Sequence, residues 1–334
     1  MRAVVAGTVW ALRQAVNQTK TLYRTRNWKE YNPALVQRGS LTLWIDTDVA
    51  NAWRAEKTGK FCKQKVYADL AIEAVLMVGK VFRQPLRQTQ GLVRSLLALM
   101  GLDLPVPDYS TLCRRRRNLT VVIDPKLGSE PIHFLIDSSG LKVMGEGEWK
   151  VRKWGKEKRR KWIKLHLGMD ARTGQITAAR GTEPSADDGS QLPDLLAATP
   201  GRIDKAGGDG AYDYVNNFRV IAERGAEPII PARLGAVLRK EPEAKARNAV
   251  VSRMEALWDE ATGDARWKQE SDYHRRSLSE SLFSRWKRVL GPEVRARDVA
   301  SQEVDSVIGC RILNRMLSLC RPVSEAVLVP VAPV

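Results

Sequence analysis

Four chemically distinct side chains lie at fixed spacing in the stretch YHRRSLSESLFSRWK, which runs from Tyr273 to Lys287. Tyr273, Arg276, Glu280 and Lys287 are offset by 0, 3, 7 and 14 residues from its start. At about 100° per residue, these positions of an α-helix lie within roughly 60° of one another. A phenol, a guanidinium, a carboxylate and an amine would therefore share one stripe. Such a stripe combines a hard metal ligand with cations that bind phosphate.

The adjoining arc of the same helix is apolar, which predicts that one side is buried. This arc contains Leu278, Leu282, Phe283, Trp286 and Leu290. An alternative interpretation is a surface helix in which Arg276 and Glu280 form an i,i+4 ion pair worth a few tenths of a kcal/mol. From the helix alone, both interpretations remain open.

The spacing Tyr-x2-Arg-x3-Glu-x6-Lys resembles the signature of bacterial insertion-sequence transposases of the DDE class, in which the Glu is the last of three metal-binding carboxylates. The resemblance implies two aspartates upstream, each within or at the end of an apolar strand. Asp137 in HFLIDSSGLKV and Asp209 in IDKAGGDGAYD fit that description. The likeness extends from about Tyr23 to about Leu319, which is nearly the whole chain.

Three carboxylates suit the chemistry that the resemblance implies, because phosphodiester cleavage by two divalent metals needs hard oxygen ligands. Asp137 would bridge two Mg²⁺ ions, and Asp209 and Glu280 would complete one each; Mn²⁺ would substitute. Water would attack at the transposon end, and the freed 3′-hydroxyl would then attack target DNA. The partners implied are the terminal inverted repeats and the target DNA, bound by a homodimer or higher oligomer at synapsis.

The choice of Asp209 as the second ligand rests on the family position, because a lone Asp after a strand is commonly a turn or cap residue. Asp213 is an alternative ligand, as are Asp187 and Asp188.

The remaining motif residues are expected to support the carboxylates. Arg276 and Lys287 would contact DNA phosphate or orient Glu280, and Tyr273 would position a strand. Two other function classes remain open: a ribonuclease H-like nuclease or resolvase without strand transfer, and a non-catalytic DNA-binding regulator. Carboxylates at all three motif positions count against loss of catalysis.

The composition favours a polyanionic partner. The 334 residues include 55 Lys and Arg against 38 Asp and Glu, for a net charge of +17, which points to nucleic acid. The sequence has no apolar run of 18 residues that could span a membrane. The four cysteines are scattered and show neither zinc nor disulfide spacing. We expect a cytoplasmic, nucleoid-associated protein, although residues 1–22 superficially resemble a secretory signal and form an uncertain extension.

Residues 23–118 predict an all-α DNA-binding domain. Helical periodicity over 65–79 and 86–100 is followed by DYSTLCRRRRN, in which Asp108 or Ser110 can cap a short basic helix. Two helices, a turn and a third basic helix resemble a helix-turn-helix. The expected DNA contacts on this third helix are Arg114, Arg115, Arg116 and Arg117.

A second basic region lies between two predicted strands and holds nine Lys or Arg residues from Lys150 to Lys164 against one acid, Glu157. We interpret it as a hairpin whose tip is a DNA-contacting ridge. The ridge residues expected to contact DNA are Lys150, Arg152, Lys153, Lys158, Arg159, Arg160 and Lys161.

Residues 131–320 predict an α/β catalytic domain. Strand patterns run first as a meander and then alternate with helices, which indicates a mixed sheet covered by helices. This order is similar to the ribonuclease H-like fold of the DDE family. Residues 233–269 show no strong period and are interpreted as an insertion, and residues 321–334 as an unstructured tail.

Overall fold

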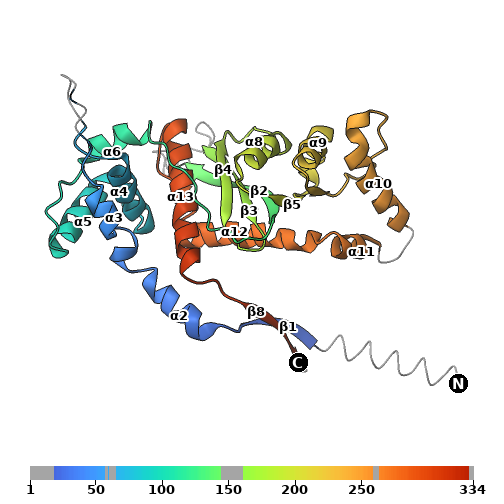
Figure 1. Ribbon diagram of the computed structural model, residues 1–334, viewed down its shortest axis with the longest axis horizontal. Helices are drawn as coiled ribbons and strands as arrows, with labels where there is room; N and C mark the ends of the chain where they lie inside the picture. The colour runs from blue at the N-terminus through green and yellow to red at the C-terminus, as the bar shows by residue number, and fades with distance from the viewer. Residues whose placement is uncertain (1–18, 57–58, 60–64, 144–160, 259–262, 331–334) are drawn as a thin grey trace, which may run out of the picture. The chain divides into compact units, whose positions relative to one another are not determined.

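A computed structural model of the chain describes residues 19–56, 59, 65–143, 161–258 and 263–330 (Figure 1). The chain forms two compact units. The first takes its described residues from both ends of the chain, 19–43 and 318–330, and the second comprises residues 44–317. No helix among the described residues is both long and apolar enough to cross a membrane.

The first unit is a two-stranded ribbon joined to a helix. Strand β1 (Thr19–Thr25) pairs antiparallel with β8 (Ser324–Pro330). Helix α2 (Trp28–Gln37) follows β1. The Asn27 side chain ties the two chain ends together, because Nδ2 donates to Arg321 O at 2.8 Å and Oδ1 accepts from Val323 N at 2.8 Å. The structure thus places a strand within the range 321–334 that the sequence predicted to be unstructured, since partner strand β1 satisfies its backbone.

The second unit begins with helices. They are α3 (Thr47–Asn51), α4 (Asp69–Val81), α5 (Leu86–Leu99) and α6 (Tyr109–Arg116). Two details match the sequence patterns: Gly101 has the positive φ of 68° that favours glycine after a helix, and Asp108 caps α6 by accepting a hydrogen bond from Ser110 N at 2.8 Å. Helix α4 is buried over most of its surface and therefore forms the centre of this helical part.

A mixed sheet follows, with strand order β4-β3-β2-β5-β6. Its strands are β2 (Ile132–Val143), β3 (Trp162–Asp170), β4 (Ile176–Thr182), β5 (Ile203–Gly207) and β6 (Glu227–Ile229). Strands β2, β3 and β4 are antiparallel neighbours, whereas β5 and β6 run parallel to β2. The short strand β7 (Glu293–Val294) pairs in parallel with the end of β2. This mixed α/β arrangement fits a ribonuclease H-like catalytic domain, as the sequence predicted.

Alternation along β2 separates two environments. Ile132, Phe134 and Ile136 pack in a core with helices α8 (Leu192–Ala198) and α9 (Val215–Glu223). The opposite side chains of the strand include Asp137, which accepts a hydrogen bond from Ser279 of helix α12 (Ser277–Val289). Figure 1 shows α12 running along the sheet.

Helix α13 (Val299–Leu319) closes the domain at its edge strand. The Asn314 amide accepts from Ile176 N and donates to Ile176 O, each at 2.8 Å, and so covers backbone groups of β4. Close packing of α13 on α12 depends on Gly309, because a Cβ there would lie 2.3 Å from the Trp286 ring.

The stretch 233–269, which lacks a clear period in the sequence, is largely helical. It holds α10 (Lys245–Trp258), and α11 (Gly263–Glu270) begins within it. A buried ion pair anchors α10, since Arg247 Nε lies 2.6 Å from Asp213 Oδ1. Its polar, weakly amphipathic sequence explains why periodicity did not reveal these helices.

Candidate active site

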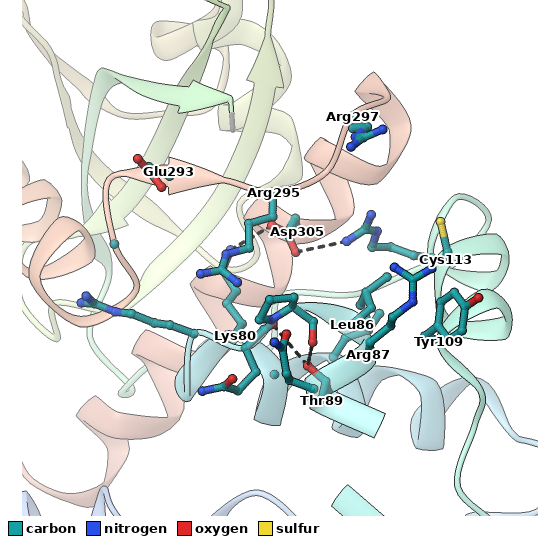
Figure 2. Close-up of a pocket in the computed structure, with 18 of the residues that line it drawn as sticks. Lys80, Leu86, Arg87, Thr89, Tyr109, Cys113, Glu293, Arg295, Arg297 and Asp305 are labelled. Carbon is teal, nitrogen blue, oxygen red and sulfur yellow. Dashed lines mark hydrogen bonds and ion pairs between the residues drawn. The ribbon is translucent and has the colours of Figure 1, made fainter. Parts of the chain in front are cut away.

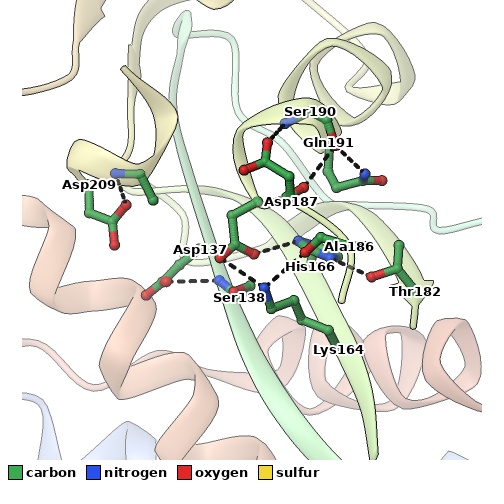
Figure 3. Close-up of polar contacts among 12 residues, drawn as sticks. Asp137, Ser138, Lys164, His166, Thr182, Ala186, Asp187, Ser190, Gln191 and Asp209 are labelled. Carbon is green, nitrogen blue, oxygen red and sulfur yellow. Dashed lines mark hydrogen bonds and ion pairs between the residues drawn. The ribbon is translucent and has the colours of Figure 1, made fainter. Parts of the chain in front are cut away.

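Asp137 lies near the middle of β2, on the face that meets α12. Its Oδ1 accepts from Ser138 N at 2.8 Å (Figure 3). Its Oδ2 accepts from Ser279 Oγ, also at 2.8 Å. Burial raises the pKa of Asp137, and the charge of Asp209 raises it further, although these hydrogen bonds and Arg276 oppose the shift. The side chain is 17% exposed. Asp137 is therefore a partly buried carboxylate held in a fixed orientation.

Asp209 follows strand β5, which is the parallel neighbour of β2. It caps the short 3₁₀ helix η3 (Gly210–Tyr212), with Oδ1 accepting from Ala211 N at 2.9 Å (Figure 3). The preceding Gly208 permits a close approach, because a Cβ there would lie 2.7 Å from the Tyr212 ring. Since the two strands run parallel with Leu135 opposite Gly207, Asp209 follows β5 at the level of Asp137, and their charges interact.

Glu280 lies in the first turn of α12 and pairs with Arg276, whose Nη2 is 2.6 Å from Glu280 Oε1. The same guanidinium places Nη1 3.8 Å from Asp137 Oδ2. Burial lowers the pKa of Arg276, but the negative groups around it outweigh burial and leave the pKa raised. Those groups include Asp137, Asp209 and Glu280. Arg276 thus sits within the electrostatic reach of all three carboxylates.

The motif does not form one continuous α-helix, which differs from the expectation. Tyr273 to Arg276 form a 3₁₀ helix, η5, and α12 starts only at Ser277. The residue before η5, Asp272, has a left-handed φ of 61°, which ends the preceding helix. Tyr273 still lies beside Arg276, and burial raises its pKa. Lys287 is exposed near the other end of α12. On the apolar arc, Leu282, Phe283, Trp286 and Leu290 are buried, as expected.

Two family models, both described as "Transposase DDE domain", match the chain: one over residues 128–315 and the other over residues 36–146. The first covers more than half of the chain and includes Asp137, Asp209 and Glu280. The chain belongs to the DDE transposases. The resemblance read from the sequence is thereby confirmed, and with it the assignment as a metal-dependent DNA transposase.

DDE transposases use divalent metal ions, so the three carboxylates can be tested as ligands. Their oxygens are of the hard type that Mg²⁺ and Mn²⁺ prefer. Among the residues that the structure describes, no three His, Cys, Asp or Glu side chains are gathered closely enough to hold a metal. Glu280 instead points to Arg276, yet its side chain is 61% exposed. The three oxygen donors therefore fit the ions chemically, and Glu280 is held by an exposed ion pair.

Asp213, which the sequence also allowed as the second ligand, has a structural partner. Its side chain is 1% exposed and accepts from Arg247 Nε at 2.6 Å and Arg247 Nη2 at 3.1 Å. The charge of Arg247 and the hydrogen bonds around Asp213 overcome the effect of burial and lower its pKa. This carboxylate is saturated by a buried cation and is poorly suited to bind a metal of the transposase.

Asp187 and Asp188 both take part in polar contacts with other side chains, and Figure 3 shows Asp187 near Ser190. Asp187 Oδ1 accepts from Tyr214 Oη at 2.9 Å. Asp188 Oδ2 lies 3.1 Å from Lys164 Nζ, and Asp188 Oδ1 lies 3.4 Å from His166 Nδ1. Burial lowers the pKa of His166 to about 4 although Asp188 opposes the shift, so the imidazole is neutral near pH 7. Both aspartates therefore already have partners outside the carboxylate trio, which makes them poorer candidates for the second ligand than Asp209.

The arginines of α6 differ in their surroundings. Arg114 is exposed and bonds only within its own helix among the described residues, to Ser110 O and Thr111 Oγ1. Arg115 donates to Tyr67 O at 3.1 Å and also pairs with Asp69. Arg116 is 7% exposed and lies 4.0 Å from Asp305. Arg117 lies 3.3 Å from Asp298. Of these four predicted DNA contacts, Arg114 is the one most available to DNA.

Most of the predicted basic ridge lies outside the described residues. This applies to Lys150, Arg152, Lys153, Lys158, Arg159 and Arg160. Lys161 is described and is exposed just before β3. The ridge remains a prediction.

Two residues near the carboxylates were missed by sequence reasoning. Ser279, 2% exposed, bonds to Asp137 and stands one residue before Glu280. Tyr212 is 1% exposed, and its hydroxyl has no hydrogen-bond partner among the described residues. Burial and the charges of four aspartates, Asp137 and Asp209 among them, raise its pKa. Tyr212 lies three residues after Asp209 in GDGAYD, and this closeness in the sequence could have marked it as a residue near the site.

Proposed function

We propose that this transposase binds the terminal inverted repeats of an insertion sequence, cleaves the element ends and joins the 3′-hydroxyl to target DNA. The observation that carries the proposal is that Arg276 contacts both Asp137 and Glu280, while the charge of Asp209 acts on both Asp137 and Arg276. A partly buried carboxylate whose pKa is raised by burial and by a second carboxylate, as for Asp137, is typical of a functional site.

In this proposal Asp137, Asp209 and Glu280 hold two divalent ions, Mg²⁺ or Mn²⁺. The ions would neutralise phosphate charge and activate the attacking oxygen. Ser138 N and Ser279 Oγ keep the Asp137 oxygens in place. Arg276 balances the carboxylate charge, and Tyr273 lies beside Arg276. Lys287, exposed on the same helix, is available to DNA phosphate.

In this proposal DNA binds to helices α4, α5 and α6 and to the basic ridge between Lys150 and Lys161. Helices α4, α5 and α6 have the order expected of a helix-turn-helix, with Arg114 exposed on the last. The net charge of +17 supports a polyanionic partner. Joining two ends requires a dimer or larger assembly, and the DNA substrate implies association with the nucleoid.

The test replaces each carboxylate by its amide: Asp137→Asn, Asp209→Asn and Glu280→Gln. Each full-length variant is incubated with Mg²⁺ and a labelled DNA that carries the inverted repeat flanking the gene, and a pre-cut end reports strand transfer separately. We expect cleavage and transfer to fall by at least about 100-fold while DNA binding persists, because the amides keep the shape but lose the charge.

Glu223→Gln is the matched control. Glu223 pairs with Arg219 at 2.6 Å with i,i+4 spacing and is 59% exposed, compared with 2.6 Å and 61% for Glu280. If Glu280→Gln cleaved as well as Glu223→Gln, the Arg276–Glu280 pair would be only a surface ion pair and the assignment would be wrong. If the parent protein cleaved the labelled DNA but did not join the pre-cut end to target DNA, it would be a nuclease without strand transfer.

A further inference from the structure

A groove of about 1060 Å³ lies within the second unit (Figure 2), and its lining includes none of the three carboxylates Asp137, Asp209 and Glu280. Helices α4, α5 and α6 supply one wall. The segment from Leu290 to Asp298, which contains β7, supplies the other, with Asp305 of α13 between them. Eight Lys or Arg residues and three Asp or Glu residues line it. The groove is therefore strongly basic.

The three acids are already neutralised by particular cations. Asp305 lies 3.2 Å from Lys80 Nζ and 4.0 Å from Arg116 Nη1. Asp298 lies 3.3 Å from Arg117 Nε. Glu293 pairs at 3.7 Å with Lys142, which lies on β2. These pairs fix the walls and leave the remaining cations uncompensated.

Five arginines of the groove make no ion pair with a described residue. Arg83 donates to backbone carbonyls, and the other four are Arg87, Arg114, Arg295 and Arg297. Arg295 and Arg297 are exposed and alternate with the buried Val294 and Ala296, each 1% exposed, so both side chains leave the same side of an extended segment. Arg87 stacks over the Tyr109 ring at 4.3 Å (Figure 2). Cations spread along an open groove suit a linear polyanion better than a single small anion.

The groove is linked to the active site by α12. Arg83 on its rim donates to Val289 O at 3.1 Å, at the end of that helix. Glu280 stands nine residues earlier on α12, about 14 Å along a helix that rises about 1.5 Å per residue. A DNA duplex that is cut at the carboxylates could therefore reach the groove within one helical turn of DNA.

We propose that this groove holds the sugar–phosphate backbone of duplex DNA, with Arg87, Arg114, Arg295 and Arg297 as the contacting cations. The inference rests on the proposed function, in that it takes DNA as the substrate, but it adds to the predicted contact Arg114 three arginines that no sequence motif indicated: Arg87, Arg295 and Arg297. Arg114 then belongs to a track shared by the helical part and the segment after α12. The contacts are to phosphate, so they are independent of base sequence.

The test compares two double variants of the full-length chain with equal loss of charge. Arg295→Gln with Arg297→Gln removes two groove cations. Arg202→Gln with Arg239→Gln removes two exposed arginines outside the groove lining. Binding of labelled random-sequence duplex is measured by fluorescence anisotropy across about 50–200 mM salt. We expect the groove variant to bind roughly 3- to 10-fold more weakly, with its salt slope lower by about 2, because each lost phosphate contact removes about 0.9 from the slope.

Equal losses in the two double variants would mean that only net charge matters and would overturn the groove. An unchanged salt slope in the groove variant would do the same. Since Arg295 and Arg297 are exposed, thermal melting should be unaffected, which separates binding from folding.

Cys113 gives a second measurement, because it is exposed and lines the groove. Alkylation of Cys113, followed by peptide mapping, should be slowed by duplex DNA in the parent and less in the groove variant. Protection that is equal in both would contradict the proposal.

Failure of the groove and failure of the proposed function give different results. Normal duplex binding by the groove variant, alongside lost cleavage in Asp137→Asn, would reject the groove and retain the transposase site. Weakened binding with full cleavage in Asp137→Asn would retain the groove and reject the site.

Discussion

Arg276 Nη2 lies 2.6 Å from Glu280 Oε1 across one turn at the start of α12. On the helix surface this is an ordinary i,i+4 pair, and such exposed pairs contribute little to stability. It differs from the Arg219–Glu223 pair in that the guanidinium also lies near a second carboxylate, 3.8 Å from Asp137 Oδ2, whereas Arg219 bonds in addition to the amide of Asn216. The two interpretations left open by the sequence therefore coexist, since the ion pair is also part of the carboxylate site.

Replacement of Arg276 by Gln should expose that difference. Without metal, Asp137, Asp209 and Glu280 lose their cation and repel one another, so we expect stability to fall by on the order of 1 kcal/mol. Added Mg²⁺ should then raise the melting temperature more than in the parent, by mass action on a site freed of a competing cation. Arg219→Gln should show neither effect. An equal Mg²⁺ response in Arg276→Gln and the parent would contradict the placement of Arg276 among the carboxylates.

Ser279 gives a prediction about pH. Its hydroxyl donates to Asp137 Oδ2 at 2.8 Å and opposes the effect of burial, which raises the pKa of Asp137. In Ser279→Ala that pKa should rise further, because the charged form loses a hydrogen bond. The carboxylate must be ionised to act, so the acid limb of the cleavage-rate profile should move to higher pH, with activity recovering as the pH rises.

Two further variants serve as controls. Ser279→Thr keeps the hydroxyl and should restore the parent pH profile. Ser277→Ala removes an exposed hydroxyl on the same helix, which bonds to His274 O at 3.0 Å and not to Asp137, and should leave the acid limb in place. A purely structural role of Ser279 would lower activity equally at every pH and leave the acid limb in place.

The carboxylates and the strands that carry them were predictable because their signals are local. An apolar run ends in Asp137, and glycines before Asp209 mark a tight turn after β5. The parallel pairing of β2 with β5, which brings the two aspartates together, depends on contacts between residues about 70 positions apart in the sequence. Periodicity carries no information on such pairing.

The surroundings of the basic residues were also beyond the sequence. RRRR at the end of α6 predicts a solvated or DNA-facing cluster, yet Arg116 is buried beside Asp305 of α13. The partner lies about 190 residues away in the sequence, so charge composition could not identify it. Arg295 and Arg297 are not part of a run of basic residues in the sequence. Only the groove that they line in the structure indicates that they could bind DNA.

Asp213 tests the distinction between a structural and a catalytic aspartate. Asp213→Asn breaks a pair in which both side chains are nearly buried, 7% exposed for Arg247 and 1% for Asp213. Leaving the Arg247 charge unpaired should cost about 3–5 kcal/mol in the free energy of unfolding. Asp209→Asn should cost far less and yet abolish cleavage. Denaturant unfolding of both variants decides the matter: a stable, inactive Asp213→Asn protein would instead favour Asp213 as the metal ligand.

The last prediction concerns the stability of the protein in mild acid. Burial lowers the pKa of both His133 and His166 to about 4, from the value of 6.5 expected for an exposed histidine. Between these values the unfolded chain binds protons that the folded chain does not. The contribution of these two histidines to the free energy of unfolding is therefore fully present above about pH 6.5. It is lost as the pH drops towards about 4, by up to about 1.4 kcal/mol per pH unit for each histidine.

His133→Gln should remove the contribution of one histidine to the slope of the free energy of unfolding against pH. The difference between variant and parent separates this contribution from that of the carboxylates, which also titrate in acid. The free energy of unfolding is measured with urea at intervals from about pH 7 to 4.5. His274→Gln is the control for the loss of an imidazole at an exposed position. Parallel curves for His133→Gln and the parent would show that His133 is protonated as readily in the folded chain as in the unfolded one, contrary to its burial at 2% exposure.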